Sequence, residues 1–328
     1  MLSIASTTFH EKVHENALVY LVQNKKFTMM NQFGFARENV QNRMDLFHMS
    51  LSYFIDHFHP EDDKVDIHIF HEGDLTTEHA LRAAKTAKRF PVFFHSIRFE
   101  FPQWLSKSDV EESISSSDIP GWRDMGYRHM CRFYSLQVYP VLIQWKYKKM
   151  MRLDDDSFTL QNLPLLFRAV SPKEPYKARL LQKESETFCQ FFYPYFHSFC
   201  ETHRISCPPQ TDPDFYLIPF NNFFVVDLSV YEQPMVLKYL DYMDKTGGIY
   251  KYRWGDALVQ GIMIKYVCGI SDIPLFTFRY SKWGLEYEEE SMELFQDTMP
   301  MKTFQGSSPF LVVWIVFILL VLILFSRG

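Results

Sequence analysis

Apolar runs and helically spaced apolar residues alternate along the first hundred residues. Three runs, at residues 17–23, 65–70 and 92–101, are short and β-branched or alternating, which predicts β-strands. Between the runs, apolar residues recur at helical spacing over residues 37–56, and an Ala- and Lys-rich stretch at residues 78–88 predicts a second helix. This order of strand and helix is typical of a Rossmann-like sheet with flanking helices.

The following part of the chain continues the α/β pattern. A polar, Ser-rich stretch at residues 106–120 predicts a surface loop, and Pro140 predicts the end of a helix over residues 126–139. The remaining predicted elements are a strand at residues 149–153, two strands within residues 215–228 around a turn at Asn221 and Asn222, and helices at residues 233–245, with a C-cap at Gly247, and 256–267. The sequence therefore predicts one α/β domain over residues 1–299.

A continuous apolar run, PFLVVWIVFILLVLILF, occupies residues 309–325 and has no charged or polar side chain. Its length is close to the minimum that crosses a hydrocarbon core of roughly 30 Å. A core helix of a globular domain would show a polar face, so the run predicts a single transmembrane helix, joined to the domain by a linker at residues 300–308. Lys302 and Arg327 flank the run and leave the orientation in the membrane open.

The composition of the chain excludes some classes of function. Hydrophobic residues make up 47% of the 328 residues and charged residues 22%, which is enough for a packed core. The formal net charge is -5 and there is no long Lys/Arg run, so we expect no nucleic-acid partner. The five cysteines form no CxxC motif and no zinc-site spacing, and whether Cys189, Cys200 and Cys207 form disulfides stays open.

Three adjacent carboxylates, Asp154, Asp155 and Asp156, follow directly after the strand predicted at residues 149–153. Such neighbours repel one another unless a cation or solvent compensates them. Ligands of open α/β sheets bind beyond the carboxyl ends of strands. A Mn²⁺ or Mg²⁺ ion there could bridge the phosphates of a nucleotide-sugar donor. The alternative is a solvated acidic turn.

Three sequence blocks carry a resemblance to a known family. Residues 126–133 (GYRHMCRF), residues 151–156 (MRLDDD) and residues 239–257, which contain YLD, KTGG and YRWGDA, occur in this order. They resemble the signature blocks of glycosyltransferase family 15, the fungal α-1,2-mannosyltransferases. The resemblance covers roughly residues 90–285 and is weak between the blocks.

The resemblance implies a GT-A fold and retaining transfer of mannose from GDP-mannose to a glycan or glycoprotein acceptor, with Mn²⁺ as cofactor, in protein glycosylation. Asp154 and Asp156 match the family's acidic metal-site positions. Tyr127 and Asp256 match residues of the active-site cleft and are the candidate catalytic residues. The family works in the Golgi lumen, so we expect a single-pass membrane protein of the Golgi or endoplasmic reticulum.

Five further residues are candidates for donor binding. Arg128 and Arg132 share a helix face and could hold phosphate oxygens, or could instead form a surface ion pair with Asp124 or a core-edge contact. Trp254 could offer a flat surface to a sugar ring or could pack in the core. Asp155 and Asn222 complete the set: Asp155 lies between the two metal-site positions, and the resemblance matches Asn222 to the asparagine of the family's Ser-Asn-Phe tripeptide.

Two departures from the family pattern put activity in question. The family has a glutamate, its proposed nucleophile, where this chain has Phe224. Either the acceptor then attacks from the front face with the leaving phosphate as base, or Asp256 does the acidic work, or activity is lost. The family's metal-binding histidine is also missing, and Glu286 is the candidate substitute. The alternative function is therefore an inactive glycosyltransferase-like membrane protein that binds a glycan or a partner.

Overall fold

The computed structural model describes residues 3–7, 12–26, 42–59, 64–115, 125–282 and 285–287, with only the backbone described for residues 3–7 and 285–287. The chain divides into two compact units, Met1–Glu293 and Leu294–Gly328, and every described residue belongs to the first. The predicted linker at 300–308 and transmembrane helix at 309–325 lie outside the described residues. Within those described ranges, no helix is long and apolar enough to cross a bilayer.

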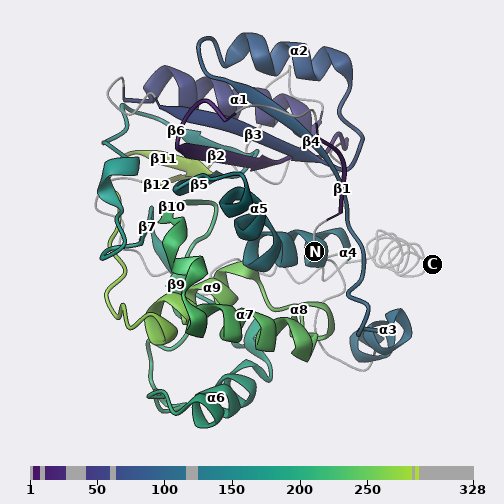
Figure 1. The fold of residues 1–328 in the computed structure, drawn as a ribbon, viewed down its shortest axis with the longest axis vertical. Helices are drawn as coiled ribbons and strands as arrows, with labels where there is room; N and C mark the ends of the chain where they lie inside the picture. Colours follow the sequence, from purple (N-terminus) through teal and green to yellow (C-terminus); the bar gives the residue numbers. More distant parts are fainter. Residues whose placement is uncertain are drawn as a thin grey trace, which may run out of the picture. The chain divides into compact units, whose positions relative to one another are not determined.

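A mixed sheet of seven strands, in the order β1-β4-β3-β2-β5-β10-β7, forms the centre of this unit (Figure 1). Four neighbouring strands run parallel, and the three others pair antiparallel. The parallel strands are β2 (Asn16–Leu21), β3 (Val65–His71), β4 (Val92–Arg98) and β5 (Lys149–Leu153), and the antiparallel ones are β1 (Ser3–Thr7), β10 (Phe223–Asp227) and β7 (Tyr176–Ala178). The expected Rossmann-like mixed sheet is thus confirmed.

Successive side chains of the central strands alternate between two buried cores. Leu18 of β2 and Met151 of β5 belong to one core, while Ala17 and Met150 belong to the other. Strands buried on both faces read as continuous apolar runs, which is the pattern that the sequence shows for β2 and β5. Both faces of the sheet are therefore covered.

Helices cover each face of the sheet, as Figure 1 shows. On one side lie α1 (Arg43–His57) and α2 (Thr77–Thr86); on the other lie α4 (Met125–Arg132), α5 (Val138–Gln144), α7 (Pro234–Thr246) and α9 (Asp256–Ile262). The remaining elements are α3 (Lys107–Ser115), α6 (Phe192–His203), α8 (Gly248–Lys251), the sheet of β12 (Leu285–Tyr287), β11 (Tyr280–Lys282) and β6 (Ser157–Thr159), and the pair β8 (Leu181–Lys183) and β9 (Leu217–Pro219).

Two local predictions are wrong. Residues 106–120 were expected to form a loop, but Lys107–Ser115 is helix α3, because Val110 supplies a buried anchor and Ser106 caps the first turn through the Asp109 amide. Pro140 does not end its helix, which runs to Gln144. A π-helical segment, Phe133–Gln137, directly precedes α5, and such a widened turn changes the backbone register that the proline meets.

Two helix ends matter for the site. Helix α1 begins with a reciprocal capping box in which Asn42 accepts from the Asp45 amide and the Asp45 carboxylate accepts from the Asn42 amide. The first residue of α1, Arg43, is thereby fixed at the helix start. Helix α7 ends at Gly247, whose φ of 71° is left-handed, and the predicted C-cap is confirmed.

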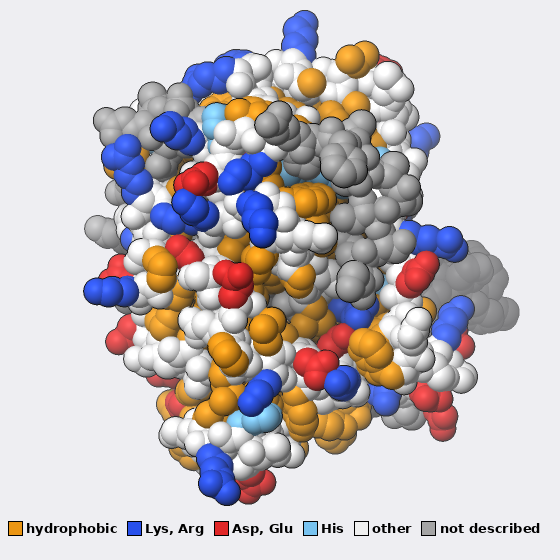
Figure 2. All heavy atoms as spheres, viewed as in Figure 1, with side chains coloured by type: hydrophobic (Ala, Val, Ile, Leu, Met, Phe, Trp, Pro, Cys, Tyr) orange, Lys and Arg blue, Asp and Glu red, His pale blue; other side chains and the backbone are white. Residues whose placement is uncertain are grey.

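The surface shown in Figure 2 is mixed in character. Lysine and arginine side chains are scattered among acidic and apolar ones on this face and do not form a continuous stripe. A nucleic-acid backbone binds to clustered positive charge, so this face offers no such footprint.

Candidate functional site

The three aspartates lie at the carboxyl end of β5, in the turn that leads to β6. The backbone amide of Asp154 donates to the carbonyl of Asn222 at 3.1 Å, which ties this acidic turn to the turn before β10. From α1, the Ser50 hydroxyl donates to the carbonyls of Asp154 at 3.3 Å and Ser157 at 2.6 Å. The acidic turn is therefore held from two sides at the sheet edge where ligands of open α/β sheets bind.

Every carboxylate oxygen of the acidic turn faces a positively charged nitrogen. Asp154 accepts from Arg152 Nε on one oxygen and from Lys282 Nζ on the other, each at 2.8 Å. Lys282 Nζ also forms an ion pair with Asp156, and the second oxygen of Asp156 lies 3.6 Å from an Arg43 nitrogen. Both oxygens of Asp155 accept from the Arg43 guanidinium in a forked pair.

Burial makes these ion pairs strong constraints. The side chains of Arg152, Asp155, Asp156 and Lys282 are at most 5% exposed, whereas Asp154 is 21% exposed and Arg43 is 32% exposed. Removing one partner of a buried pair leaves an uncompensated charge, which costs roughly 3–5 kcal/mol. Asp154 and Arg43 are the members of this cluster that solvent, and hence a ligand, reaches most easily.

Arg152 joins the acidic turn to Asp256, the first residue of α9. Its guanidinium pairs with Asp256 and lies 3.6 Å from the centroid of the Tyr134 ring. The Asn221 amide lies 3.5 Å from the same Asp256 oxygen and donates to Gln260. The structure therefore brings two of the sequence-predicted acidic positions, Asp154 and Asp256, onto one arginine.

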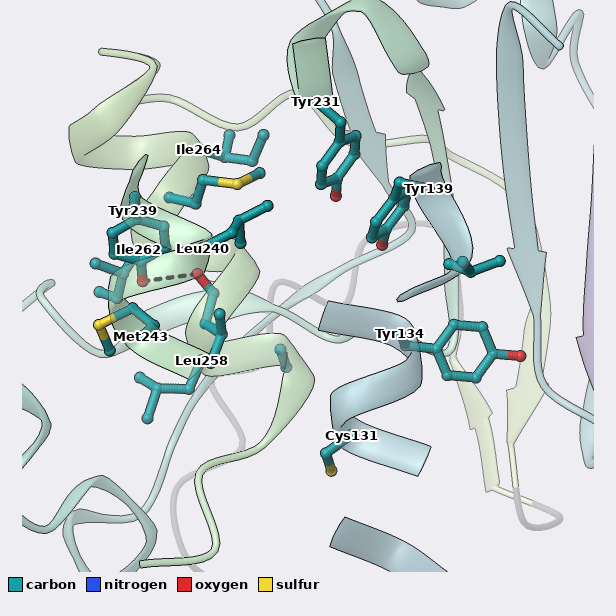
Figure 3. Close-up of a cluster of buried hydrophobic side chains, with 14 of the residues drawn as sticks. Cys131, Tyr134, Tyr139, Tyr231, Tyr239, Leu240, Met243, Leu258, Ile262 and Ile264 are labelled. Atoms are coloured by element: carbon teal, nitrogen blue, oxygen red, sulfur yellow. Dashed lines mark hydrogen bonds between the residues drawn. The ribbon is translucent and has the colours of Figure 1, made fainter. Parts of the chain in front are cut away.

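Several buried tyrosines lie in the core that contains α7 and α9, and Figure 3 shows four of them, Tyr134, Tyr139, Tyr231 and Tyr239. Tyr139 and Tyr231 stack with ring centroids 3.5 Å apart, and the Gln260 amide donates to the Tyr139 hydroxyl and the Tyr134 carbonyl. Across the same core, the Tyr239 hydroxyl donates to the Val259 carbonyl at 3.0 Å, which fixes α7 against α9. These contacts tie α9, which begins with Asp256, to the surrounding core.

The charges in the cluster shift one another's pKa. Burial would lower the pKa of Lys282, but Asp154 and Asp156 outweigh it and raise that pKa above its usual value. Burial likewise opposes ionisation of Asp154, yet Arg152 and Lys282 hold the pKa of Asp154 below its usual range. For Asp155, burial is the largest effect and, with the neighbouring Asp156, it raises the pKa to about 6 although Arg43 opposes it.

A divalent cation does not fit this arrangement of side chains. Asp154 and Asp156 were predicted to hold Mn²⁺ or Mg²⁺, but Lys282 Nζ contacts both carboxylates. A divalent ion about 4 Å from this ammonium group would be repelled by about 8 kcal/mol at an effective dielectric constant near 20. Among the residues that the structure describes, no three His, Cys, Asp or Glu side chains are grouped to hold a metal ion.

A second part of the site lies beside the N-terminus of α9. A Cβ atom added to Gly255 would lie 3.9 Å from the Tyr127 hydroxyl and 4.0 Å from a Glu184 oxygen, so both groups flank the residue that precedes Asp256. Arg253 covers the Tyr127 ring at 4.9 Å and has a left-handed φ of 59°. Backbone strain of this kind clusters at functional sites.

The arginines predicted to hold phosphate have protein partners. Arg132 forms an ion pair with Asp244 at 2.8 Å, and Arg128 is 2% exposed and donates to the Tyr250 carbonyl. Arg132 thus forms an ion pair with Asp244, whereas the partner that the sequence offered, Asp124, lies outside the described residues. A phosphate role for either arginine stays a prediction.

Trp254 packs in the core instead of presenting an open face. It is fully buried, and its indole Nε1 donates to the Gln190 carbonyl at 2.8 Å. Gly248 contributes the space, because a Cβ there would lie 2.1 Å from the Trp254 ring. The tryptophan positions the turn before Asp256 and, as placed here, cannot stack on a sugar ring.

The other sequence candidates occupy different positions. Asn222 is 3% exposed, and neither of its side-chain polar atoms has a hydrogen-bond partner among the described residues. Phe224 is fully buried and stacks on Tyr176, with centroids 5.1 Å apart. Glu286 pairs with Ser281 in the β11–β12 ladder, so it lies near Lys282 along the backbone, while its side chain is outside the described part.

Sequence reasoning missed Arg43, Arg152, Lys282 and Glu184. Arg152 was part of the block MRLDDD, so its proximity to Asp154 was visible in the sequence. Arg43 and Lys282 carried no such signal, because they reach the acidic turn from α1 and β11, more than 100 residues away along the chain.

The mixed sheet with covering helices, and the acidic turn at the carboxyl end of β5, define a protein of GT-A-like α/β fold. The fold of core-mannan synthase A from Aspergillus fumigatus, solved in its Mn/GDP form, matches with a TM-score of 0.68 at 17% identity and covers 86% of this chain and 79% of that chain. The mannosyltransferase Ktr4p from S. cerevisiae, solved with GDP, matches with a TM-score of 0.66 at 18% identity, over 85% and 76% of the two chains.

Sequence comparisons show similarity to mannosyltransferases over part of the chain. Residues 213–284 match the family model described as glycolipid 2-alpha-mannosyltransferase. Alpha-1,2 mannosyltransferase KTR1 of Saccharomyces cerevisiae is 26% identical over 179 residues, which are 50% of this chain and 46% of that protein. The chain thus spans about half the length of the curated relatives it matches. The matched segment and these relatives agree with the resemblance to glycosyltransferase family 15 that the three sequence blocks carry.

Proposed function

We propose that this protein is a retaining glycosyltransferase that moves a hexose, with mannose from GDP-mannose as the expected donor, onto a glycan acceptor. The observation that carries the proposal is the Arg152 bridge, which holds Asp154 and Asp256 together at the ligand-binding edge of the sheet. The named activities of the relatives and the GDP complexes of the structural neighbours support the choice of donor.

Charge stabilisation is the chemistry that these residues can supply. Breaking a glycosidic bond to a diphosphate develops positive charge on the sugar and negative charge on the leaving group. A carboxylate at Asp256 would stabilise the sugar cation, and Arg43, the most exposed cation of the acidic turn, would face the departing phosphate. The side-chain amide of Asn222, which has no partner among the described residues, would be available to a donor hydroxyl.

The position of Phe224 argues for front-face attack by the acceptor. A phenylalanine cannot form a covalent glycosyl intermediate, so the leaving phosphate would take the acceptor's proton. Tyr127, whose hydroxyl flanks the start of α9, would position the acceptor or the sugar. In this assignment the base comes from the donor and the protein supplies no nucleophile.

A donor-hydrolysis screen over nucleotide-sugars tests the proposal. We expect release of GDP from GDP-mannose by the full chain and loss of at least about 100-fold in turnover in Asp256→Asn, since a charge that acts only in the transition state is removed. Asp241→Asn is the matched control, because Asp241 is exposed and pairs with Lys245, one helical turn away on α7. Full activity in Asp256→Asn would remove the assigned role.

The second candidate function is an inactive relative that binds a glycan or a partner at a membrane. The buried Phe224 at the family's glutamate position favours it. Calorimetry with GDP and with oligomannose separates the two functions. Oligomannose binding without GDP binding or donor turnover would favour the binding protein.

We further propose that the protein works at a membrane of the Golgi or endoplasmic reticulum, anchored by residues 309–325. The uninterrupted apolar run supports an anchor. Carbonate extraction of the full chain, compared with a chain that stops at residue 308, tests the anchor, and protease protection of intact vesicles reports which side the domain faces. Extraction of the full chain into the soluble fraction would contradict the proposal.

A further inference from the structure

We infer that Lys282 is a built-in counter-ion that takes the place of a divalent cation between Asp154 and Asp156, so that this acidic turn is closed to metal and the protein binds its nucleotide without one. The statement about the turn stands on the geometry of this chain alone. The statement about the nucleotide rests on the proposed function.

Lys282 lies between the two candidate metal ligands. A divalent cation at this turn would use one or two of the carboxylates, with water and phosphate oxygens as its other ligands. Lys282 Nζ already contacts both candidates, at 2.8 Å from Asp154 and in an ion pair with Asp156. The remaining oxygen atoms of these two side chains face Arg152 and Arg43. Each carboxylate oxygen of the pair thus already has a cationic neighbour.

The charges of the cluster nearly balance without a metal ion. Within the described residues, four carboxylates of the cluster, those of the acidic turn and Asp256, face three cations, Arg43, Arg152 and Lys282. The cluster carries a formal charge of about -1, which a buried site tolerates better than the larger charge left by removing a cation. Substituting Lys282 would leave Asp154 and Asp156 without their shared cation, and a divalent ion could then enter.

The register of a small sheet places the lysine beside the aspartates. Lys282 lies on β11, which pairs antiparallel with β6, and Lys282 is opposite Ser157, the residue after the aspartates. The strand pairing therefore holds the ammonium group at the turn.

Electron paramagnetic resonance of Mn²⁺, recorded with protein and no nucleotide, tests the closed turn directly. For the wild-type chain we expect the free-ion signal to persist, with any dissociation constant above about 1 mM. Lys282→Ala and the size-matched Lys282→Gln should bind Mn²⁺ at least about tenfold more tightly. Lys245→Ala, which removes an exposed lysine, should behave as wild type.

The wild-type measurement tests whether the acidic turn binds a metal ion even if a variant fails to fold. Circular dichroism shows whether each variant is folded. Micromolar Mn²⁺ binding by the wild-type chain would overturn the inference. Equal and weak binding in folded Lys282→Gln and in wild type would overturn the role of the lysine. Both outcomes are independent of catalysis.

Calorimetric titration of GDP, once with EDTA and once with Mn²⁺, tests whether the protein binds its nucleotide without a metal ion. Equal GDP affinity in both buffers supports metal-free binding, and GDP binding that requires Mn²⁺ overturns it. Absence of GDP binding in either buffer would instead refute the proposed donor, and with it metal-free nucleotide binding, while the resonance experiment still tests the closed turn.

Discussion

A methyl group at Gly248 is the smallest perturbation that should disturb the site from a distance. In Gly248→Ala the added Cβ would lie 2.1, 2.2 and 2.4 Å from three atoms of the Trp254 ring. Trp254 is fully buried and donates to the Gln190 carbonyl, so the ring has no solvent-filled space to enter. It lies two residues before Asp256, and its displacement should move the start of α9.

The expected cost follows from opposing terms. Overpacking a well-filled core costs about 1–3 kcal/mol, and contacts this short belong at the upper end. Losing the indole hydrogen bond adds about 1 kcal/mol. Gly248 begins α8, where alanine's better helix propensity returns up to about 1 kcal/mol. We therefore expect Gly248→Ala to lower the free energy of unfolding by about 3 kcal/mol.

Urea denaturation followed by tryptophan fluorescence measures this change. Gly255→Ala is the control, because its nearest contacts are at 3.9 and 4.0 Å and it should stay within about 1 kcal/mol of wild type. In a Trp254→Leu background, Gly248→Ala should lose most of its cost, since the two changes share one contact. If Gly248→Ala were as stable as wild type, helix propensity would have outweighed packing and the reasoning would be refuted.

Two further predictions concern buried charge. Arg152→Ala should lower the free energy of unfolding by about 3–5 kcal/mol, because it leaves Asp154 and Asp256 without their shared cation. Urea denaturation midpoints measure this loss. A loss under about 1 kcal/mol would contradict the role of Arg152 as a bridge. Burial, with Arg82 nearby, lowers the pKa of His48 to about 4. The folded state therefore favours the neutral form of His48. The contribution of this group to the free energy of unfolding is fully present above pH 6.5 and is lost as the pH falls toward 4. Between pH 7.5 and 5 the free energy of unfolding should fall by about 1–2 kcal/mol. His48→Phe should flatten that pH dependence of the urea midpoint, and an unchanged slope would contradict it.

Much of the fold could be predicted because its signals are local. The strand at residues 149–153 was predicted with the bounds that β5 has, and the turn between β9 and β10 falls at Asn221 and Asn222. Apolar runs and turn residues determine these elements within a few positions. The helix at 107–115 was missed because its polar, Ser-rich surface hides the single buried residue, Val110.

The candidate site was only half predictable for the same reason. The position of the aspartates after a strand is a local property, and it identified the acidic turn. Whether those aspartates are open to a metal depends on Lys282, 128 residues from Asp154, and on Arg43, 112 residues from Asp155. The sequence around Lys282, a single lysine on a short strand, gives no sign that this side chain contacts the aspartates. The ligand that an acidic motif takes is therefore decided by tertiary contacts.

The resemblance matches Phe224 to a family glutamate, and this position is connected to the same cluster through the register of the sheet. Phe224 lies directly opposite Arg152 on the neighbouring antiparallel strand, and such cross-strand pairs project from the same face. A carboxylate at position 224 would therefore compete for the arginine that now bridges Asp154 and Asp256. With phenylalanine there, stacked on Tyr176, the guanidinium has these two carboxylates as its acidic partners. The loss of one acid in the strand pair is thus accompanied by firmer placement of another, and Asp256 is the carboxylate on which any glycosyl transfer by this chain should depend.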